Sequence, residues 1–364
     1  PSIVLILLGD VISNAYQESQ LQQGIFAPET VSVGDLFAGA LLPGLLLVGI
    51  YIVYLSGIAL FRGNKSPAVP PEDRYRFYEG IRAALKTLPA PLLLIVAVLG
   101  AILTGKATPT EAASVGAVGG LLIAGSRSIL AKGAALWLSR AGLMSIVFLL
   151  ILSESFDMRL GRETVTGADE LATVLAFGLC SILALGVIAA LWSLVADKLF
   201  MPIMRKSAEV TTMVFTILIG AALFSLVFKG LGGEETIASA LSNTPGGVTG
   251  AVIIVMLVMF VLGFFLDFIE IVLVAAPLVA PALLTLGVDP IWLGVMMAVN
   301  LQTSFLTPPF GFALFYLRGV APSHVRTTQI YKGALPFVGI QIGMLCVLAF
   351  FPEIATWLPA QIYQ

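Results

Sequence analysis

The stretch that decides the fold reads Asn300-Leu301-Gln302-Thr303-Ser304-Phe305-Leu306-Thr307-Pro308-Pro309-Phe310-Gly311. It lies inside an apolar segment, residues 291–320, that is long enough to cross a bilayer. Pro308 and Pro309 lack N–H donors and clash with the preceding turn, and Thr307 leaves helical geometry because it precedes a proline. A helix must therefore break at membrane depth, where freed carbonyls cannot face lipid and have to line a protein-enclosed site. Broken helices of this kind hold cations or substrates at the midplane of transporters.

The composition is that of a polytopic membrane protein. Of the 364 residues, 59% are hydrophobic and 11% charged, and the mean hydropathy is +1.02, whereas a soluble domain is about 25% charged. Cys180 and Cys346 lie in apolar segments and the single histidine, His324, lies in a polar loop, so neither a disulfide nor a transition-metal site is expected. A net charge of −2 and the lack of a basic cluster with interleaved aromatics give no indication of a nucleic-acid partner.

The distribution of basic residues orients the apolar segments. These lie at about 1–14, 35–61, 86–104, 110–126, 134–153, 171–196, 209–228, 248–285, 291–320 and 333–351. With the loop at 62–86 in the cytoplasm, 15 of the 19 basic residues fall on the cytoplasmic side, as the positive-inside rule requires. This holds only if 248–285 enters and leaves on the outer side. We therefore predict a re-entrant hairpin there, with its tip at 263–270.

Two parts of the chain resemble each other in opposite orientations. Pro1-Ser2 opens an apolar half-helix, and Leu36–Gly44 follows after a loop; Pro308-Pro309-Phe310 opens another, and Ile330–Phe337 follows. The first half-helix would run towards the outside and the second towards the inside. This arrangement predicts an all-α membrane protein built as an inverted repeat, as in many secondary transporters.

Oxygen-bearing side chains gather at the helix break. Asn300, Thr303, Ser304 and Thr307 offer ligands that suit a hard monovalent cation such as Na⁺. The alternative is that the hydroxyls bond back to their own helix, which explains one or two such residues but not four beside two prolines.

Two carboxylates, Asp267 and Glu270, fall at the predicted hairpin tip, and ionisable groups at that depth indicate function. The alternative for Asp267 is a cap on the second arm, and the two roles are compatible. Thr211 and Thr212 either pack a helix or face the site. Thr108 and Glu111 predict a capping box at the start of a helix rich in small residues, and a direct ion contact is the minority view there.

The sequence contains no catalytic constellation. It has no Ser-His-Asp set, no metal-ligand cluster and no phosphate-binding loop of the form G-x-x-x-x-G-K-[ST]. We therefore do not expect an enzyme, and the alternative of an intramembrane enzyme lacks a paired nucleophile and base. No cofactor is expected beyond Na⁺ as a coupling ion.

Three motifs resemble the large membrane subunit of TRAP transporters (tripartite ATP-independent periplasmic transporters). They are Asn300–Gly311 with the following Phe312–Pro322, Ala107–Ala117 and Gly263–Asp267, and Pro1–Val4 resembles the end of the break in the family's first repeat. The resemblance covers essentially the whole chain. It implies a Na⁺-driven, elevator-type importer of small organic acids. The implied partners are a small membrane subunit and a periplasmic substrate-binding protein, in the bacterial cytoplasmic membrane.

The resemblance also implies where ions and substrate bind. The Na⁺ site of the second repeat falls on Gly263, Asp267, Asn300, Thr303, Thr307 and Pro308. Candidates for the substrate or a second ion are Ser2, Thr211, Thr212, Glu270, Ser304 and Gly311. Pro1 and Ser2 would belong to a first-repeat site whose hairpin is absent from this sequence.

An extra pair of apolar segments with an acidic external loop occupies 131–205. This departure resembles the mannitol/chloroaromatic subgroup, which is related to transporters of 2-oxo and hydroxy monocarboxylates. The expected organisation is the end of a first repeat at 1–61, whose earlier part we expect to be missing, then a cytoplasmic loop and connecting helices at 62–130, the extra pair at 131–205, and the second repeat at 206–364. The alternative function is a receptor-independent Na⁺/carboxylate or arsenite-type carrier of similar architecture.

Overall fold

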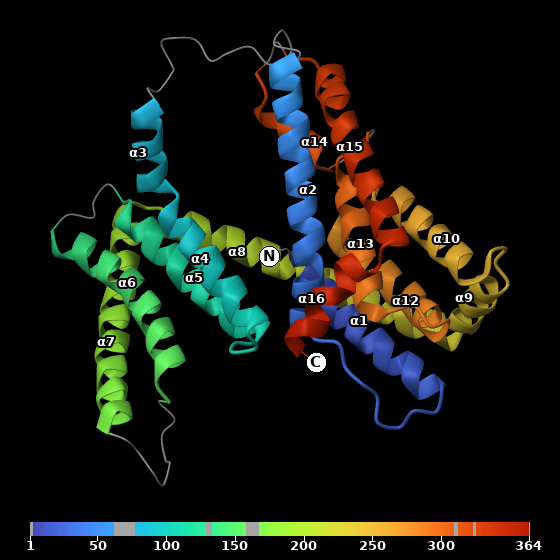
Figure 1. Ribbon diagram of the computed structural model, residues 1–364, viewed down its shortest axis with the longest axis horizontal. Helices are drawn as coiled ribbons and strands as arrows, with labels where there is room; N and C mark the ends of the chain where they lie inside the picture. Colours follow the sequence, from blue (N-terminus) through green and yellow to red (C-terminus); the bar gives the residue numbers. More distant parts are fainter. Residues whose placement is uncertain are drawn as a thin grey trace. The chain divides into compact units, whose positions relative to one another are not determined.

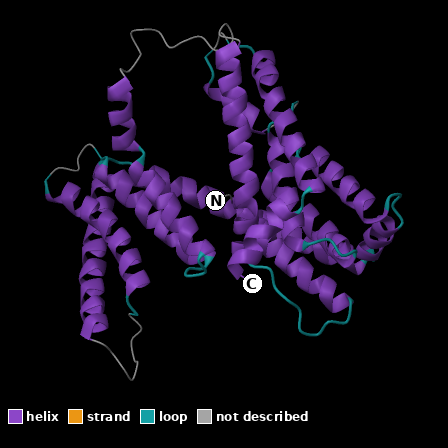
Figure 2. Ribbon diagram, in the orientation of Figure 1, coloured by secondary structure: helices purple, strands orange, loops and turns teal. Residues whose placement is uncertain are grey.

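The computed structural model describes residues 3–61, 77–128, 133–157, 167–308, 312–322 and 325–363. Within these ranges every regular element is a helix (Figure 2). The chain divides into two compact units, one formed by Pro1–Pro70 with Met213–Gln364 and the other by Pro71–Thr212. The boundary at Thr212 falls inside the long helix α8 (Phe200–Gly230).

Six helical spans in the described part of the chain are long and apolar enough to cross a membrane. They are Val33–Phe61, Ala134–Ser155, Gly167–Ala196, Phe200–Gly230, Phe268–Thr285 and Thr327–Phe350. These spans confirm the prediction of an all-α polytopic membrane protein.

The first unit is built around a core to which helices before and after the second unit in the sequence both contribute (Figure 1). Its elements are α1 (Ile3–Gln22), α2 (Val33–Phe61), α9 (Gly233–Ser242), α10 (Gly247–Leu262), α11 (Phe268–Glu270), the π-helix η2 (Ile271–Ala275), α12 (Ala276–Thr285), α13 (Pro290–Phe305), α14 (Phe312–Val320), α15 (Thr327–Phe350) and α16 (Glu353–Tyr363). Leu8 and Ile12 of α1 are fully buried in the cluster that contains Leu293 and Met297 of α13. Packing of α1 against α12 and α13 thus joins the start of the chain to the helix that precedes the break.

Helix α1 is longer than the half-span predicted at 1–14. Its final turns are held by polar contacts that hydropathy does not register. The Gln20 amide accepts from Glu29 N–H at 2.8 Å and donates to Glu29 C=O at 3.3 Å, and the Ser19 hydroxyl donates to Tyr16 C=O at 2.8 Å. Both Ser19 and Gln20 are buried.

The predicted hairpin is present as two helical arms. The first arm, α10, ends at Gly263, and the second begins after Asp267. Both α10 and α12 contact the same short helix, α9, as the two arms of a hairpin would (Figure 1). Its re-entrant position in a bilayer remains a prediction.

The second arm contains one π-helical stretch, η2, between Glu270 and α12. The Ala276 N–H donates to Ile271 C=O, five residues earlier. Pro277 follows, has no N–H and would clash with the carbonyl four residues before it, so a wider turn here relieves that contact. Such π-bulges are frequent at functional sites.

The predicted helix break is confirmed. Helix α13 ends at Phe305, Leu306 caps it, and Thr307 and Pro308 lie outside helical structure. Helix α14 begins at Phe312, after residues 309–311, which are outside the described ranges. Helices α2 and α15 follow the two proposed breaks, and the prolines of the two matched segments, Pro43 and Pro336, lie inside these helices.

The second unit holds α3 (Phe77–Thr87), α4 (Pro89–Leu103), α5 (Pro109–Ser126), α6 (Ala134–Ser155) and α7 (Gly167–Ala196). The predicted capping box starts α5, with the Glu111 N–H donating to the Thr108 hydroxyl at 3.3 Å and the Thr108 N–H donating to the Glu111 carboxylate at 2.8 Å. The two apolar segments predicted in 131–205 are α6 and α7, and most of the acidic loop between them lies outside the described residues.

Glycines bring α6 and α7 into direct backbone contact. A Cβ built on Gly186 would lie 2.7 Å from the Leu138 carbonyl oxygen and 3.0 Å from Gly142 Cα. Because helices in lipid associate through close packing rather than a hydrophobic drive, small residues at this seam let the backbones approach.

Gly186→Ala should therefore lower the stability of the protein by about 1–3 kcal/mol, because the added methyl meets backbone that cannot move aside. Thermal unfolding of the purified protein in detergent measures this. The control is Gly178→Ala in the same helix, where an added Cβ meets nothing within 4 Å. Equal unfolding temperatures for both variants would contradict the packing argument.

Candidate functional site: a hairpin turn against a helix break

The hairpin turn begins at Gly263, which is buried against α13. A Cβ built on Gly263 would lie 2.1 Å from Ser304 Oγ and 2.5 Å from Ser304 Cβ. Only glycine therefore allows the turn to approach the last helical turn before the break. Gly263 also ends α10, its N–H donating to the Met259 carbonyl at 3.0 Å.

Asp267 caps the second arm of the hairpin, as one of the two predicted roles requires. Its Oδ1 accepts a hydrogen bond from the Phe268 N–H at 2.8 Å, and its backbone is extended. Asp267 and Glu270 are both half-buried, and among the described residues no basic side chain forms an ion pair with either. The cap accounts for one carboxylate oxygen of Asp267, and no described basic side chain offsets the negative charge.

The polar side chains at the end of α13 are almost completely enclosed. Asn300, Thr303 and Ser304 are each at most 2% exposed. The Asn300 amide donates to the Met256 carbonyl at 2.8 Å and so ties α13 to the first arm of the hairpin. Two of the candidate residues therefore contact the hairpin directly, Ser304 through Gly263 and Asn300 through Met256.

The hydroxyls bond back to their own helix more often than the sequence argument allowed. Thr303, Ser304 and Thr307 donate to the carbonyls of Val299, Leu301 and Thr303 at 2.7, 2.7 and 2.8 Å. The expectation that back-bonding explains only one or two of these residues was therefore wrong. A hydroxyl that donates its hydrogen keeps its lone pairs, so these oxygens still have acceptor capacity.

Aromatic rings complete the contact between the hairpin and the break. Phe268 and Phe305 lie with ring centroids 5.4 Å apart at 62°. Neither this ring pair nor the Met256 carbonyl acceptor was predicted from the sequence. Two phenylalanines in apolar segments are an ordinary feature, and a backbone acceptor has no sequence signature, so neither was recognisable in advance.

The remaining predicted residues have different positions. Pro308 is half-buried directly after Thr307, and Glu270 ends the short helix α11. Thr211 and Thr212 are exposed residues of α8 at the end of the second unit. Ser2 and Gly311 lie outside the described residues. The assignment of Na⁺ or substrate to any of these residues stays a prediction.

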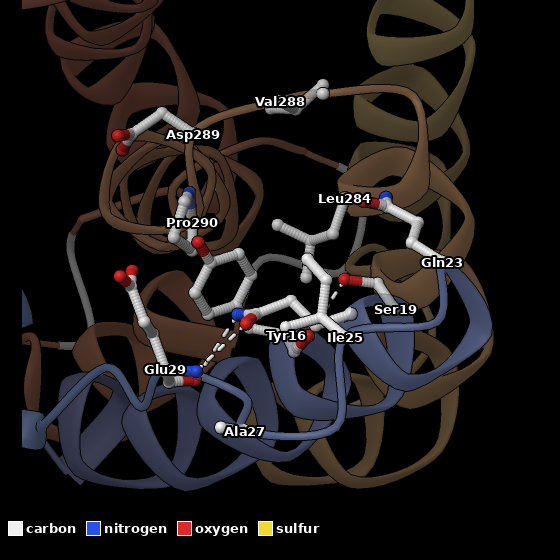
Figure 3. Close-up of a pocket in the computed structure, with 12 residues that line it drawn as sticks. Tyr16, Ser19, Gln23, Ile25, Ala27, Glu29, Leu284, Val288, Asp289 and Pro290 are labelled. Atoms are coloured by element: carbon white, nitrogen blue, oxygen red, sulfur yellow. Dashed lines mark hydrogen bonds between the residues drawn. The ribbon is translucent and has the colours of Figure 1, made fainter.

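The first unit also contains a polar pocket, separate from the hairpin contact. A pocket of about 510 Å³ lies between the end of α1 with its following loop and the turn before α13 (Figure 3). Tyr16, Gln20, Glu29 and Asp289 are among the residues that line it. Burial raises the pKa of the Tyr16 phenol, and the negative charges of Glu29 and Asp289 raise it further. The loop after α1 and the turn before α13 are both predicted to lie on the outer side of the membrane.

Comparison with known proteins identifies the family. The family model for the tripartite ATP-independent periplasmic transporter, DctM component, matches residues 24–155 and 132–354. The C4-dicarboxylate TRAP transporter large permease proteins of Vibrio cholerae and Pseudomonas aeruginosa are 28% and 29% identical over 333 residues, which cover 92% of this chain and 62% and 61% of those proteins. The sialic acid TRAP transporter large permease protein of Vibrio cholerae is 23% identical over 361 residues, 99% of this chain and 63% of that protein.

The chain thus spans about three fifths of the length of the curated relatives it matches. These relatives are named as transporter permease proteins rather than enzymes, in agreement with the prediction. The resemblance noted in the sequence is confirmed. The chain belongs to the DctM component family of tripartite ATP-independent periplasmic transporters.

Proposed function

We propose that the chain is the transporting part of a TRAP large permease that imports small organic acids across the bacterial cytoplasmic membrane. The observation that carries the proposal is the buried contact of the Gly263 turn with Ser304, beside a helix that breaks in mid-span. The names of its relatives, which include C4-dicarboxylate, sialic acid and isethionate transporters, support organic acids as the class. Within that class we propose 2-oxo or hydroxy monocarboxylates.

The chemistry of the cluster supports Na⁺ as the coupling ion. Its donors are the Asp267 carboxylate, the side-chain oxygens of Asn300, Thr303 and Thr307, and backbone carbonyls near Gly263 and Pro308. Oxygen ligands of this kind suit a hard cation, and the charge of Asp267 has no protein counter-ion among the described residues. The substrate carboxylate would bind alongside, where helix N-termini and the bound Na⁺ favour an anion.

The proposed movement is of elevator type. The segments assigned to the two proposed repeats lie in one compact unit with a common core, which supports a body that carries the site across the membrane as a whole. The proposed partners are a periplasmic substrate-binding protein that delivers the acid and a small membrane subunit.

Uptake by the full permease with its small subunit in proteoliposomes tests this function. We expect accumulation of a labelled 2-oxo or hydroxy monocarboxylate only with an inward Na⁺ gradient and only with the binding protein added. Uptake that persists without any binding protein would favour the alternative of a receptor-independent carrier. Uptake that ignores Na⁺ would refute the coupling.

Thr307→Ala should abolish Na⁺-dependent uptake, because it removes an oxygen directly before the break. Thr307→Ser keeps that oxygen and should retain most uptake. The measurement is initial uptake rate against Na⁺ concentration, with membrane insertion checked by the amount of purified protein. Normal uptake by Thr307→Ala would remove this residue from the proposed Na⁺ site.

A further inference from the structure

Three buried polar atoms lie without a protein partner at the contact between α2 and α15. They are the hydroxyl oxygen of Tyr51 and both the Nε2 and the Oε1 of Gln341, none of which has a hydrogen-bond partner among the described residues. Gln341 is completely buried. Buried polar atoms are nearly always hydrogen-bonded, so three orphans at one place need an explanation.

The two side chains face each other across the seam between the final helices of the two proposed repeats. Tyr51 and Gln341 are near enough for a polar interaction, yet no pair of their atoms meets hydrogen-bond geometry. The Tyr51 ring is fixed by Phe337, with ring centroids 5.2 Å apart at 70°. The phenol therefore cannot swing away to bond elsewhere without losing that contact.

The seam lies inside the unit, at about the depth of Asn300 in α13. The Trp292 indole N–H donates to the Leu348 carbonyl at 2.7 Å and so fixes the register of α13 against α15. Gln341 lies seven residues from Leu348 and Asn300 eight residues from Trp292, which is about 10–12 Å along either helix. Asn300 and Ile342 also line one common groove, which places Gln341 close to the depth of the candidate site.

The hydrogen-bonding capacity of the three atoms decides which bound species can pair with all of them. Gln341 presents one donor and one acceptor, and the tyrosine hydroxyl can act as either. A cation would use the two oxygens and leave the amide nitrogen without an acceptor. A water molecule both donates and accepts, and buried waters typically make about three hydrogen bonds to otherwise unsatisfied groups.

We propose that Tyr51 and Gln341 hold an internal water molecule that links the last helix of the first repeat to the last helix of the second. This water would connect α2 and α15 through hydrogen bonds inside the unit. It goes beyond the proposed transport function and does not depend on the identity of the substrate.

The test uses conservative variants and thermal unfolding of the purified protein in nanodiscs. If the water is held, Tyr51→Phe and Gln341→Leu each remove a partner and should lower the unfolding temperature by roughly 2–4 °C. The double variant should unfold at no lower temperature than the less stable single variant, because the two residues act through the same water molecule. Tyr54→Phe is the matched control, since Tyr54 packs on the same Phe337 ring at 5.5 Å.

The opposite results would overturn the proposal. If the atoms were true orphans, exchanging them for apolar groups would leave the unfolding temperature unchanged or raise it. A high-resolution structure should show density within hydrogen-bonding distance of all three atoms; a direct bond between Tyr51 and Gln341 without such density would also refute the water. Replacing Na⁺ with K⁺ should not change the effect of Gln341→Leu, and a change would indicate a cation instead.

Discussion

Asp267→Ala should abolish Na⁺-dependent uptake in the reconstituted transporter. The substitution removes the cap on the second hairpin arm, which costs about 0.5–2 kcal/mol of stability. It also removes the only charged group among the proposed Na⁺ ligands. Two unit charges about 4 Å apart attract by about 4 kcal/mol at an effective dielectric constant near 20. Loss of that attraction corresponds to a drop in Na⁺ affinity of roughly several hundred-fold, beyond what Na⁺ in the assay can restore.

Asp267→Asn separates the charge from the cap. Asparagine is as good an N-cap as aspartate, so its oxygen can still accept from the Phe268 N–H. We expect this variant to keep the unfolding temperature of the parent protein and still to lose Na⁺-dependent uptake. Glu235→Ala, at an exposed position of α9, is the control for loss of a carboxylate. Full uptake by Asp267→Asn would show that the residue is only a cap.

Gly263→Ala should lower the free energy of unfolding. It should also reduce the uptake rate by at least the factor that corresponds to this loss of free energy. The new methyl would lie 2.1 Å from Ser304 Oγ and 2.5 Å from Ser304 Cβ, so the hairpin turn has to move away from the break. Overpacking of this kind costs about 1–3 kcal/mol, which is roughly a 5- to 150-fold loss if it falls entirely on the transporting conformation. Uptake rate and unfolding temperature should be measured on the same preparation.

A second substitution tests whether Ser304 is the cause. Ser304→Ala leaves Cβ in place and should rescue little, whereas Ser304→Gly removes both clashing atoms. Gly263→Ala should therefore cost much less in a Ser304→Gly background than in the parent, a non-additivity that only contacting residues show. Gly339→Ala, where a Cβ meets nothing within 4 Å, controls for the loss of glycine. Additive effects would mean that the turn does not depend on this contact.

The sequence predicted those parts of the fold that covalent chemistry dictates. Two adjacent prolines end a helix in any context, and α13 does stop just before them. Thr108 and Glu111 form their capping box because the bonds are local to one helical turn. Asp267 caps for the same reason, and long apolar runs identified the spans because lipid requires them.

The features that the sequence did not reveal depend on partners distant in the chain. The end of α1 is stabilised by Gln20 bonding to the Glu29 backbone, which no hydropathy pattern registers. The extent of back-bonding by Thr303 and Ser304 was underestimated, because a hydroxyl between apolar neighbours bonds to its own helix when no better partner is nearby. The contact of Gly263 with Ser304 joins two residues 41 positions apart, so only the folded chain makes it visible.

The π-helical stretch at Ile271–Ala275 has a consequence for comparing members of this family. A π-bulge accommodates one more residue than the α-helical stretch it replaces, and helical structure continues on either side of it. Homologues can therefore gain or lose one residue here without displacing the cap at Asp267 or the prolines of α12. Alignments of this arm should accordingly allow a single-residue gap between Glu270 and Pro277, since a gap-free alignment would pair residues that lie about 100° apart around the helix.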